Sequence, residues 1–217
     1  MNQAGSPLAP VGVLGGTFNP VHYGHLRSAL ELVEHLQLGE LRLMPCAVPP
    51  HREAPSCSAE HRAAMVELAV AGEPCLACDS RELNRPGTSY TIDSLVELRQ
   101  ELGAGHSLCL VMGGDAVGLI ETWHRWRELL DYAHLVIIAR PGWHLPEDGV
   151  VADWLAAHRL TDHSALRRRP AGGIVIEELR PLDISSTEIR EMLAAGRSPR
   201  YLLPESVLDY IKLHHLY

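Results

Sequence analysis

Two histidines near the start of the chain, His22 and His25, have the type and spacing to bind a phosphate. They lie three residues apart, so they share one face if a helix has begun by His22. Residues 15–20 (GGTFNP) form a glycine-rich turn before them, in which the backbone can approach a ligand closely. Where such a turn enters a helix, free N–H groups and positive potential suit an anion whose charge grows during a reaction. A tight turn with two ordinary surface histidines is the alternative.

A second group of polar residues lies late in the chain, where the sequence predicts the start of another helix. Ser185 and Glu188 have the spacing of a capping box, and Ile184 and Ile189 occupy the staple positions beside it. The helix is expected to run from Ser185 to Gly196, because glycine commonly follows the end of a helix.

The first turn of that helix carries groups that can hold a pyrophosphate. Ser186 and Thr187 provide hydroxyls, and Arg190 provides a guanidinium. The helix N-terminus adds backbone N–H groups. An ordinary, well-capped helix is the alternative, because the same residue types favour any helix start.

Alternating strands and helices position these two groups. The apolar runs are nearly continuous, which indicates a parallel sheet that is covered on both faces. Right-handed crossovers then give a single α/β domain over residues 1–217, with a Rossmann-like, doubly wound parallel sheet. Ligands bind such sheets at the carboxyl ends of the strands, where residues 15–25 lie. The expected strands are 11–14, 41–44, 75–78, 108–112, 135–139 and 174–176, and the expected helices are 26–36, 59–71, 91–102, 126–132 and 185–196.

The segments between these elements are expected to be loops. They are residues 48–55, residues 84–89, the basic run at 167–170, and a longer loop that begins at Arg140. The C-terminal part, from about residue 182 to 217, is expected to be helical and to carry the second phosphate-binding group.

Composition and charge narrow the class of protein. The chain has 217 residues, of which 46% are hydrophobic and 21% charged, which is ordinary for a globular protein with a real core. Its net charge of −8 disfavours nucleic acid or an anionic membrane surface as a partner. Residues 1–10 lack the pattern of a signal peptide, and no apolar run approaches the length of a membrane span.

The cysteines and histidines predict no resident metal. An odd count of five cysteines without an export signal predicts reduced thiols in the cytoplasm. Cys75 and Cys78 form a C-x-x-C in an expected strand, where residues three apart face opposite sides, so we interpret them as small buried hydrophobic residues. Beyond His22 and His25, the thirteen histidines show no ligand spacing.

The glycine-rich turn and the later helix together resemble a known family. Residues 16–20 followed by residues 22–25 (HYGH) are similar to the signature of the HxGH nucleotidyltransferases. That family also carries a Ser-Ser/Thr-Thr-x-x-Arg segment late in the chain, which residues 185–190 match. The resemblance implies an enzyme that joins a nucleoside monophosphate to a second phosphate and releases pyrophosphate.

Further stretches resemble one branch of this superfamily, the bacterial nicotinate-nucleotide adenylyltransferases. With them, the resemblance covers nearly the whole chain. It implies that ATP reacts with nicotinate mononucleotide in line and without a covalent intermediate, with Mg²⁺ accompanying ATP, to give deamido-NAD and pyrophosphate. The matching stretches are residues 48–52, 81–85 leading into 89–91, 113–115 followed by 122–123, 133–135 through 140–142, and 202–204.

The resemblance assigns the site residues, and their chemistry agrees with it. An aromatic face at Trp123 suits a pyridinium ring, although a core tryptophan is the alternative, and Asp115 can accept from ribose hydroxyls. The ATP-binding residues are expected to be Gly15, Gly16, Thr17, Phe18, His22, His25, Gly113, Asp115, Ile184, Ser185, Ser186, Thr187 and Arg190. The mononucleotide-binding residues are expected to be Thr17, Phe18, His51, Arg52, Thr91, Trp123, His124 and Arg140, and the catalytic residues His22, His25 and Arg190.

A few positions depart from the pattern of this branch. Asn19 stands where many members have aspartate, and Cys46 and Ala47 stand where two asparagines are expected. His124 replaces an aromatic residue, which matters little if contacts there use the backbone N–H.

Other functions fit the sequence less well. A dinucleotide-dependent oxidoreductase shares the fold class, but its G-x-G-x-x-G fingerprint is absent. A non-catalytic nucleotide-binding regulator has no need of two histidines and a distant arginine. The open alternatives within the superfamily are nicotinamide mononucleotide or another phosphate acceptor. A homo-oligomer is also left open.

Overall fold

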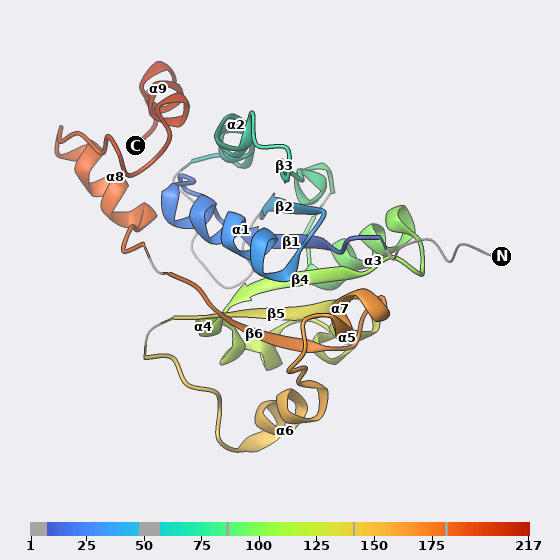
Figure 1. Cartoon of the computed structure of the whole chain (residues 1–217). Helices are drawn as coiled ribbons and strands as arrows, with labels where there is room; N and C mark the ends of the chain where they lie inside the picture. Colours follow the sequence, from blue (N-terminus) through green and yellow to red (C-terminus); the bar gives the residue numbers. More distant parts are fainter. Residues whose placement is uncertain (1–7, 48–56, 86, 141, 181) are drawn as a thin grey trace. The chain divides into compact units, whose positions relative to one another are not determined.

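The computed structural model describes residues 8–47, 57–85, 87–140, 142–180 and 182–217 (Figure 1). Residues 48–56 lie outside this part, so the predicted loop at 48–55 and the predicted ligand residues His51 and Arg52 are not described.

Six strands form one sheet, hydrogen-bonded in the order β3-β2-β1-β4-β5-β6. The pairs β2–β3, β4–β5 and β5–β6 are parallel. The order reverses direction at β1, as in a doubly wound Rossmann sheet, so the predicted fold class is confirmed. The strands are β1 Val11–Gly16, β2 Glu40–Pro45, β3 Leu76–Cys78, β4 Leu108–Gly113, β5 His134–Ala139 and β6 Ile174–Glu178.

The connections between strands are mostly helical. The α-helices are α1 Tyr23–Leu36, α2 Ala59–Val70, α3 Thr91–Leu102, α4 Gly114–Val117, α5 Leu129–Tyr132, α6 Gly149–His158, α7 Ala165–Arg168, α8 Ser186–Ala194 and α9 Glu205–Leu213. The 3₁₀ segments are η1 Arg81–Asn84, η2 Ile120–Thr122 and η3 Trp126–Glu128.

The chain divides into two compact units. The first comprises residues 1–13, 32–40 and 90–179, and the second comprises residues 14–31, 41–89 and 180–217. The prediction of a single domain over residues 1–217 stays a prediction.

The first unit is built on β4, β5 and β6, which lie side by side in Figure 1. Leu108, Leu110, Leu135, Ile137 and Ile174 are at most 3% exposed, which explains why these strands read as apolar runs. Ile92, Leu95 and Leu98 give α3 a fully buried stripe at helical spacing.

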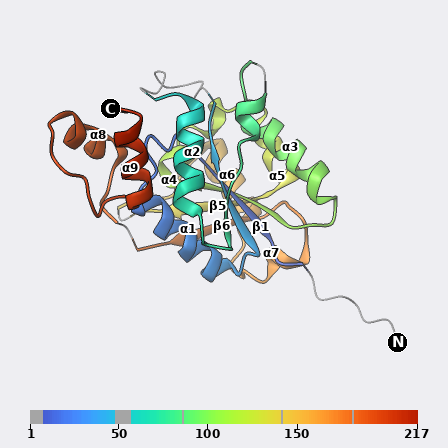
Figure 2. The same ribbon diagram turned by 90° about the horizontal axis from the view of Figure 1, so that it is seen from above.

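The second unit contains β2, β3 and helices α2, α8 and α9. Figure 2 shows α2 beside α9, and the two helices are in contact. His61 of α2 is hydrogen-bonded to the Tyr210 hydroxyl of α9, with 2.9 Å between Nδ1 and the oxygen. Val207, Leu208 and Ile211 form the buried face of α9.

Several predicted boundaries need correction. Helix α1 begins at Tyr23, so the helix whose start was left open near His22 contains His25 but not His22. The predicted helix 126–132 is a 3₁₀ turn followed by the short α5. The basic run expected to be a loop lies partly in α7. The longer loop after Arg140 contains α6, whose signal is weak because two β-branched valines begin it and only Val151 and Leu155 are buried.

Candidate active site

The two predicted histidines lie in the turn between β1 and α1. Their rings stack, with centroids 3.8 Å apart and planes inclined by 28°. The backbone N–H of His22 donates to Nδ1 of His25 across 3.3 Å. Because Nδ1 accepts this bond, the proton of a neutral His25 lies on Nε2. His22 is only 4% exposed, so the pair is a built feature of the turn and not two surface histidines.

Gly24 is required between the two histidines. A Cβ at this position would lie 3.0 Å from Cε1 and Nδ1 of the His22 ring and 3.5 Å from the Ile184 carbonyl oxygen. Any side chain would therefore push the ring out of the stack or separate the turn from the segment that precedes α8.

Phe18 packs beneath the histidine turn. Its ring meets His25 edge-on, with centroids 5.1 Å apart, and the residue is 2% exposed. Its backbone has a φ of 47°, which is rare for a bulky residue and typical of strained functional turns. Gly16 makes room for it, because a Cβ there would lie 2.8 Å from Phe18 Cζ.

The predicted second group lies against this turn. Ser185 caps α8 and its Oγ accepts from the N–H of Glu188, as the capping box predicts. Ser186 Oγ donates to the Pro20 carbonyl across 2.9 Å, and Arg190 Nη1 donates to the Asn19 carbonyl across 2.8 Å. The structure therefore brings the two predicted groups together.

Arg190 has the geometry to bind an anion as well as the turn. It also donates from Nη2 to Thr187 Oγ1 across 3.2 Å. A guanidinium carries five N–H donors, and these two bonds orient it while leaving donors for an anion at the start of α8.

Two further contacts hold the turn, and the sequence analysis missed the role of both. The Tyr23 N–H, which begins α1, donates to the Leu202 carbonyl across 3.0 Å. The Tyr217 hydroxyl donates to Asn19 Oδ1 across 2.5 Å. Burial raises the pKa of Tyr217, so the hydroxyl stays protonated and can donate. No local signal marks Tyr217, because its partner lies at the other end of the chain.

The predicted ribose-binding residue lies in the first unit. Asp115 belongs to α4, which follows Gly113 at the end of β4. Its carboxylate lies 3.4 Å from Nη1 of Arg140, and both side chains are more than 70% exposed. An exposed pair of this kind contributes little, so a ligand can displace it.

The predicted pyridine-binding residues also lie in the first unit. Thr91 begins α3, where backbone N–H groups are directed out of the helix. The neighbouring Tyr90 packs on His124, with ring centroids 4.6 Å apart. Trp123 is half-buried, and its N–H donates to the Ile120 carbonyl. The backbone N–H of Trp123 is therefore already used within the protein.

The position of these first-unit residues relative to the histidine turn stays a prediction. So does the contribution of His51 and Arg52, which lie outside the described residues.

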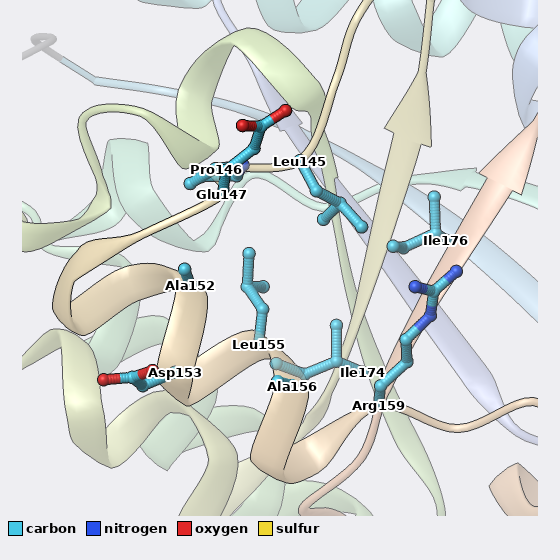
Figure 3. Close-up of a pocket in the computed structure, with 10 residues that line it drawn as sticks. All are labelled: Leu145, Pro146, Glu147, Ala152, Asp153, Leu155, Ala156, Arg159, Ile174 and Ile176. Atoms are coloured by element: carbon cyan, nitrogen blue, oxygen red, sulfur yellow. The ribbon is translucent and has the colours of Figure 1, made fainter.

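A cavity of about 370 Å³ lies between α6, β6 and residues 145–147 (Figure 3). Leu145, Leu155 and Ile176 line it with mostly apolar surface. None of the predicted site residues lines it.

The cysteines are thiols. All five are free, and burial raises the pKa of both Cys78 and Cys109 to about 12. Cys75 lies just outside β3, and Cys78 ends it. Across the described ranges, no three His, Cys, Asp or Glu side chains are grouped to hold a metal ion. In the same part of the chain, no helix combines the length and apolarity needed to cross a membrane.

Comparison with known proteins gives the family. Residues 13–192 match the sequence model of the family described as cytidylyltransferase-like. A protein of Aeromonas salmonicida, named a probable nicotinate-nucleotide adenylyltransferase, is 52% identical over 96% of this chain and 97% of its own length. The chain belongs to the nicotinate-nucleotide adenylyltransferase family. A Pseudomonas aeruginosa relative with the same name is 50% identical over 95% of this chain and 96% of its own.

Solved structures agree on the fold. A Plasmodium falciparum nicotinic acid mononucleotide adenylyltransferase, solved in complex with NaAD, superposes with a TM-score of 0.69 over 96% of this chain and 97% of its own. The sequences are 18% identical, so this likeness concerns the fold. The resemblance inferred from the two motifs is thus confirmed, and the chain is an adenylyltransferase of this family.

Proposed function

We propose that this enzyme transfers the adenylyl group of ATP to nicotinate mononucleotide, giving deamido-NAD and pyrophosphate. Membership of the nicotinate-nucleotide adenylyltransferase family supports this reaction. The observation that carries it is the stacked pair His22–His25, held against the N-terminus of α8 in one compact unit.

The reaction needs no nucleophile from the protein. A phosphate oxygen of the mononucleotide, already ionised, attacks the α-phosphorus of ATP, and the bond to the β-phosphate oxygen breaks as pyrophosphate leaves. Catalysis then consists of positioning and of stabilising charge on the phosphates. His25 would donate from Nε2, because its Nδ1 is occupied by the His22 N–H.

The leaving pyrophosphate would meet the start of α8. The helix N-terminus and the remaining donors of Arg190 favour the charge that develops there. Ser186 would help to hold the turn in place and would not bind the phosphate with its hydroxyl, because that hydroxyl donates to the Pro20 carbonyl.

Magnesium would enter with ATP as part of the substrate. When bound with ATP, it would neutralise part of the charge on the phosphates. The donors gathered around the turn are imidazoles, hydroxyls and a guanidinium, which suit phosphates and not the ion itself. We also propose a cytoplasmic location, which the five free thiols support.

The choice of nicotinate over nicotinamide would follow from hydrogen-bond donors. The start of α3 at Thr91 offers N–H groups that suit both oxygens of a carboxylate. An amide would direct its own NH₂ at donors and leave buried groups unpaired, which typically lowers affinity about tenfold to a few hundredfold.

One experiment tests the proposal. The enzyme is incubated with Mg²⁺, ATP and either nicotinate or nicotinamide mononucleotide, and pyrophosphate release is followed. We expect release with both ATP and nicotinate mononucleotide present, and a kcat/KM at least about tenfold lower with the nicotinamide form. Equal values would indicate a dual-specificity enzyme, and no release would contradict the proposed reaction.

A further inference from the structure

Arg62 is the largest fully buried side chain among the described residues, with 1% of its surface exposed. It lies in α2 and directs its guanidinium at backbone oxygens. Nη1 donates to the Thr17 carbonyl across 2.7 Å, and Nη2 donates to the carbonyls of Cys46 and Ala47 across 2.7 and 3.0 Å. Arginine is rarely fully buried unless its guanidinium is paired or hydrogen-bonded.

These three carbonyls belong to the carboxyl ends of two neighbouring strands. Thr17 follows β1, and Cys46 and Ala47 follow β2. The Cys46 N–H donates to the Gly16 carbonyl across 2.9 Å, so the two strand ends are paired up to the point where Arg62 joins them. Thr17 is the residue before Phe18, on which the ring of His25 packs.

Among the described residues, the charge of Arg62 is met by backbone dipoles. Within the described part of the chain, no carboxylate forms an ion pair with Arg62; its partners there are backbone oxygens, with Cys46 Sγ 4.0 Å from Nη1. A buried cation whose charge is met by neutral backbone dipoles keeps its field, and that field is strong in a low-dielectric interior. It would favour an anion brought to the turn.

A second arginine provides a matched contrast. Arg99 of α3 also donates to backbone carbonyls, those of Tyr132, Gly103, His106 and Pro170. Tyr132, His106 and Pro170 precede β5, β4 and β6, so Arg99 joins the amino ends of strands. Ligands bind such sheets at the carboxyl ends, where Arg62 lies. The two arginines therefore make the same kind of contact at opposite ends of the strands.

We propose that Arg62 is a positioning residue for the phosphate-binding turn. It fixes the Thr17 carbonyl, and through it the backbone that sets Phe18 and His25. It also supplies buried positive charge that favours the substrate phosphates. The inference rests on the proposed function, because it assigns Arg62 to the same adenylyl-transfer site.

The test compares Arg62→Ala and Arg62→Lys with Arg99→Ala and Arg99→Lys. For each variant, kcat, KM for both substrates, ATP binding at equilibrium and unfolding in urea are measured. All four variants lose stability, because each leaves carbonyls unpaired. We expect Arg62→Ala alone to lose about a hundredfold in kcat per folded molecule, the effect of a displacement of about 1 Å at a reacting centre. The Arg99 variants should stay within about twofold.

Arg62→Lys and added guanidinium distinguish the effect of the paired N–H donors of arginine from the effect of its positive charge. Arg62→Lys keeps the charge but not the paired N–H geometry, so ATP binding should be largely kept while kcat falls about tenfold. Millimolar guanidinium should restore part of the kcat of Arg62→Ala, whereas methylammonium at equal ionic strength should not. A purely structural arginine would show neither effect.

The measurements distinguish failure of the inference about Arg62 from failure of the proposed adenylyl transfer. Near-normal kcat in folded Arg62→Ala, or equal losses in the Arg62 and Arg99 variants, would overturn the inference while leaving adenylyl transfer intact. If Arg62→Ala does not fold, unchanged kcat and ATP binding in Arg62→Lys would overturn it. If the unmodified enzyme released no pyrophosphate, ATP binding would still decide, and we expect it to be weaker in Arg62→Ala than in Arg99→Ala.

Discussion

At the scale of single residues, the site depends on close approach. The rings of His22 and His25 stack only because Gly24 has no side chain, and Phe18 packs on His25 only because Gly16 has none. The glycines of the motif thus have two uses: they shape the turn, and they admit aromatic rings.

Removal of His25 tests its assigned role in the reaction. We expect His25→Ala to lower kcat about a hundred- to a thousandfold with little change in KM, because a donor that acts mainly on the transition state is lost. Steady-state kinetics check this. His158→Ala is the control, because His158 is bonded to the Trp154 carbonyl of its own helix and is not among the predicted site residues. Near-normal kcat in His25→Ala would show that the assignment is wrong.

Gly24→Ala tests the stack without removing a donor. The added Cβ would lie 3.0 Å from the His22 ring, so the rings must separate, and we expect kcat to fall about tenfold or more. Gly118→Ala is a matched control, since its nearest atom would be the Asp115 carbonyl oxygen at 4.0 Å. Equal kcat in the two variants would show that stacking is not needed.

Tyr217→Phe tests the bond to Asn19. Loss of the hydroxyl leaves Asn19 Oδ1, in a residue only 8% exposed, without this donor. We expect the free energy of unfolding to fall by about 0.5–1.5 kcal/mol and kcat to fall severalfold. Tyr201→Phe, at a position that is 84% exposed, should change neither. Unfolding in urea and initial rates provide both readouts.

At the scale of elements, α8 and the β1–α1 turn act as one site. The helix begins at Ser186 with a satisfied cap, and two of its side chains bind carbonyls of the turn. A helix start of this kind holds an anion best when it is fixed in place, because its N–H groups then point at one position.

Arg190→Ala tests this arrangement. The change removes both the link to Asn19 and the charge at the start of α8, so KM for ATP should rise about tenfold or more while mononucleotide binding is largely kept. Arg197→Ala, an exposed position beyond the end of α8, serves as the control. Weaker mononucleotide binding with unchanged use of ATP would reverse the assignment of the two phosphate sites.

At the scale of the whole molecule, one buried histidine links stability to pH. His134 is fully buried at the start of β5, where Nε2 donates to the Arg169 carbonyl across 2.9 Å and Nδ1 accepts from the Gly173 N–H across 3.0 Å. Acceptance at Nδ1 requires the neutral ring. Burial lowers the pKa of His134 accordingly.

The stability that His134 contributes decreases as the pH falls. Because the folded pKa lies below the unfolded value of about 6.5, the unfolded chain takes up the proton first as pH falls. His134 makes its full contribution to the free energy of unfolding above the unfolded pKa. This contribution is lost as the pH falls from the unfolded pKa to the folded pKa. We expect urea unfolding to show declining stability over this window and a smaller decline in His134→Gln. Identical pH profiles would show that His134 does not contribute.

The sequence by itself determined what depends on neighbours along the chain. The apolar strands, the glycine-rich turn and the capping box at Ser185 are local patterns, and the structure has each where it was predicted. The parallel sheet followed from their alternation. Weak local signals were misjudged, as with α6, where few buried positions mark the helix.

Only the tertiary structure decided which distant residues meet. Arg62 reaches Thr17 across 45 positions, Arg190 reaches Asn19 across 171, and Tyr217 reaches Asn19 across 198. No spacing rule encodes such pairs, because they form only when packing brings separate elements together and offsets the entropy of closing the chain between them. Arg62 was not among the predicted site residues, and its contacts with the ends of β1 and β2 exist only in the folded chain.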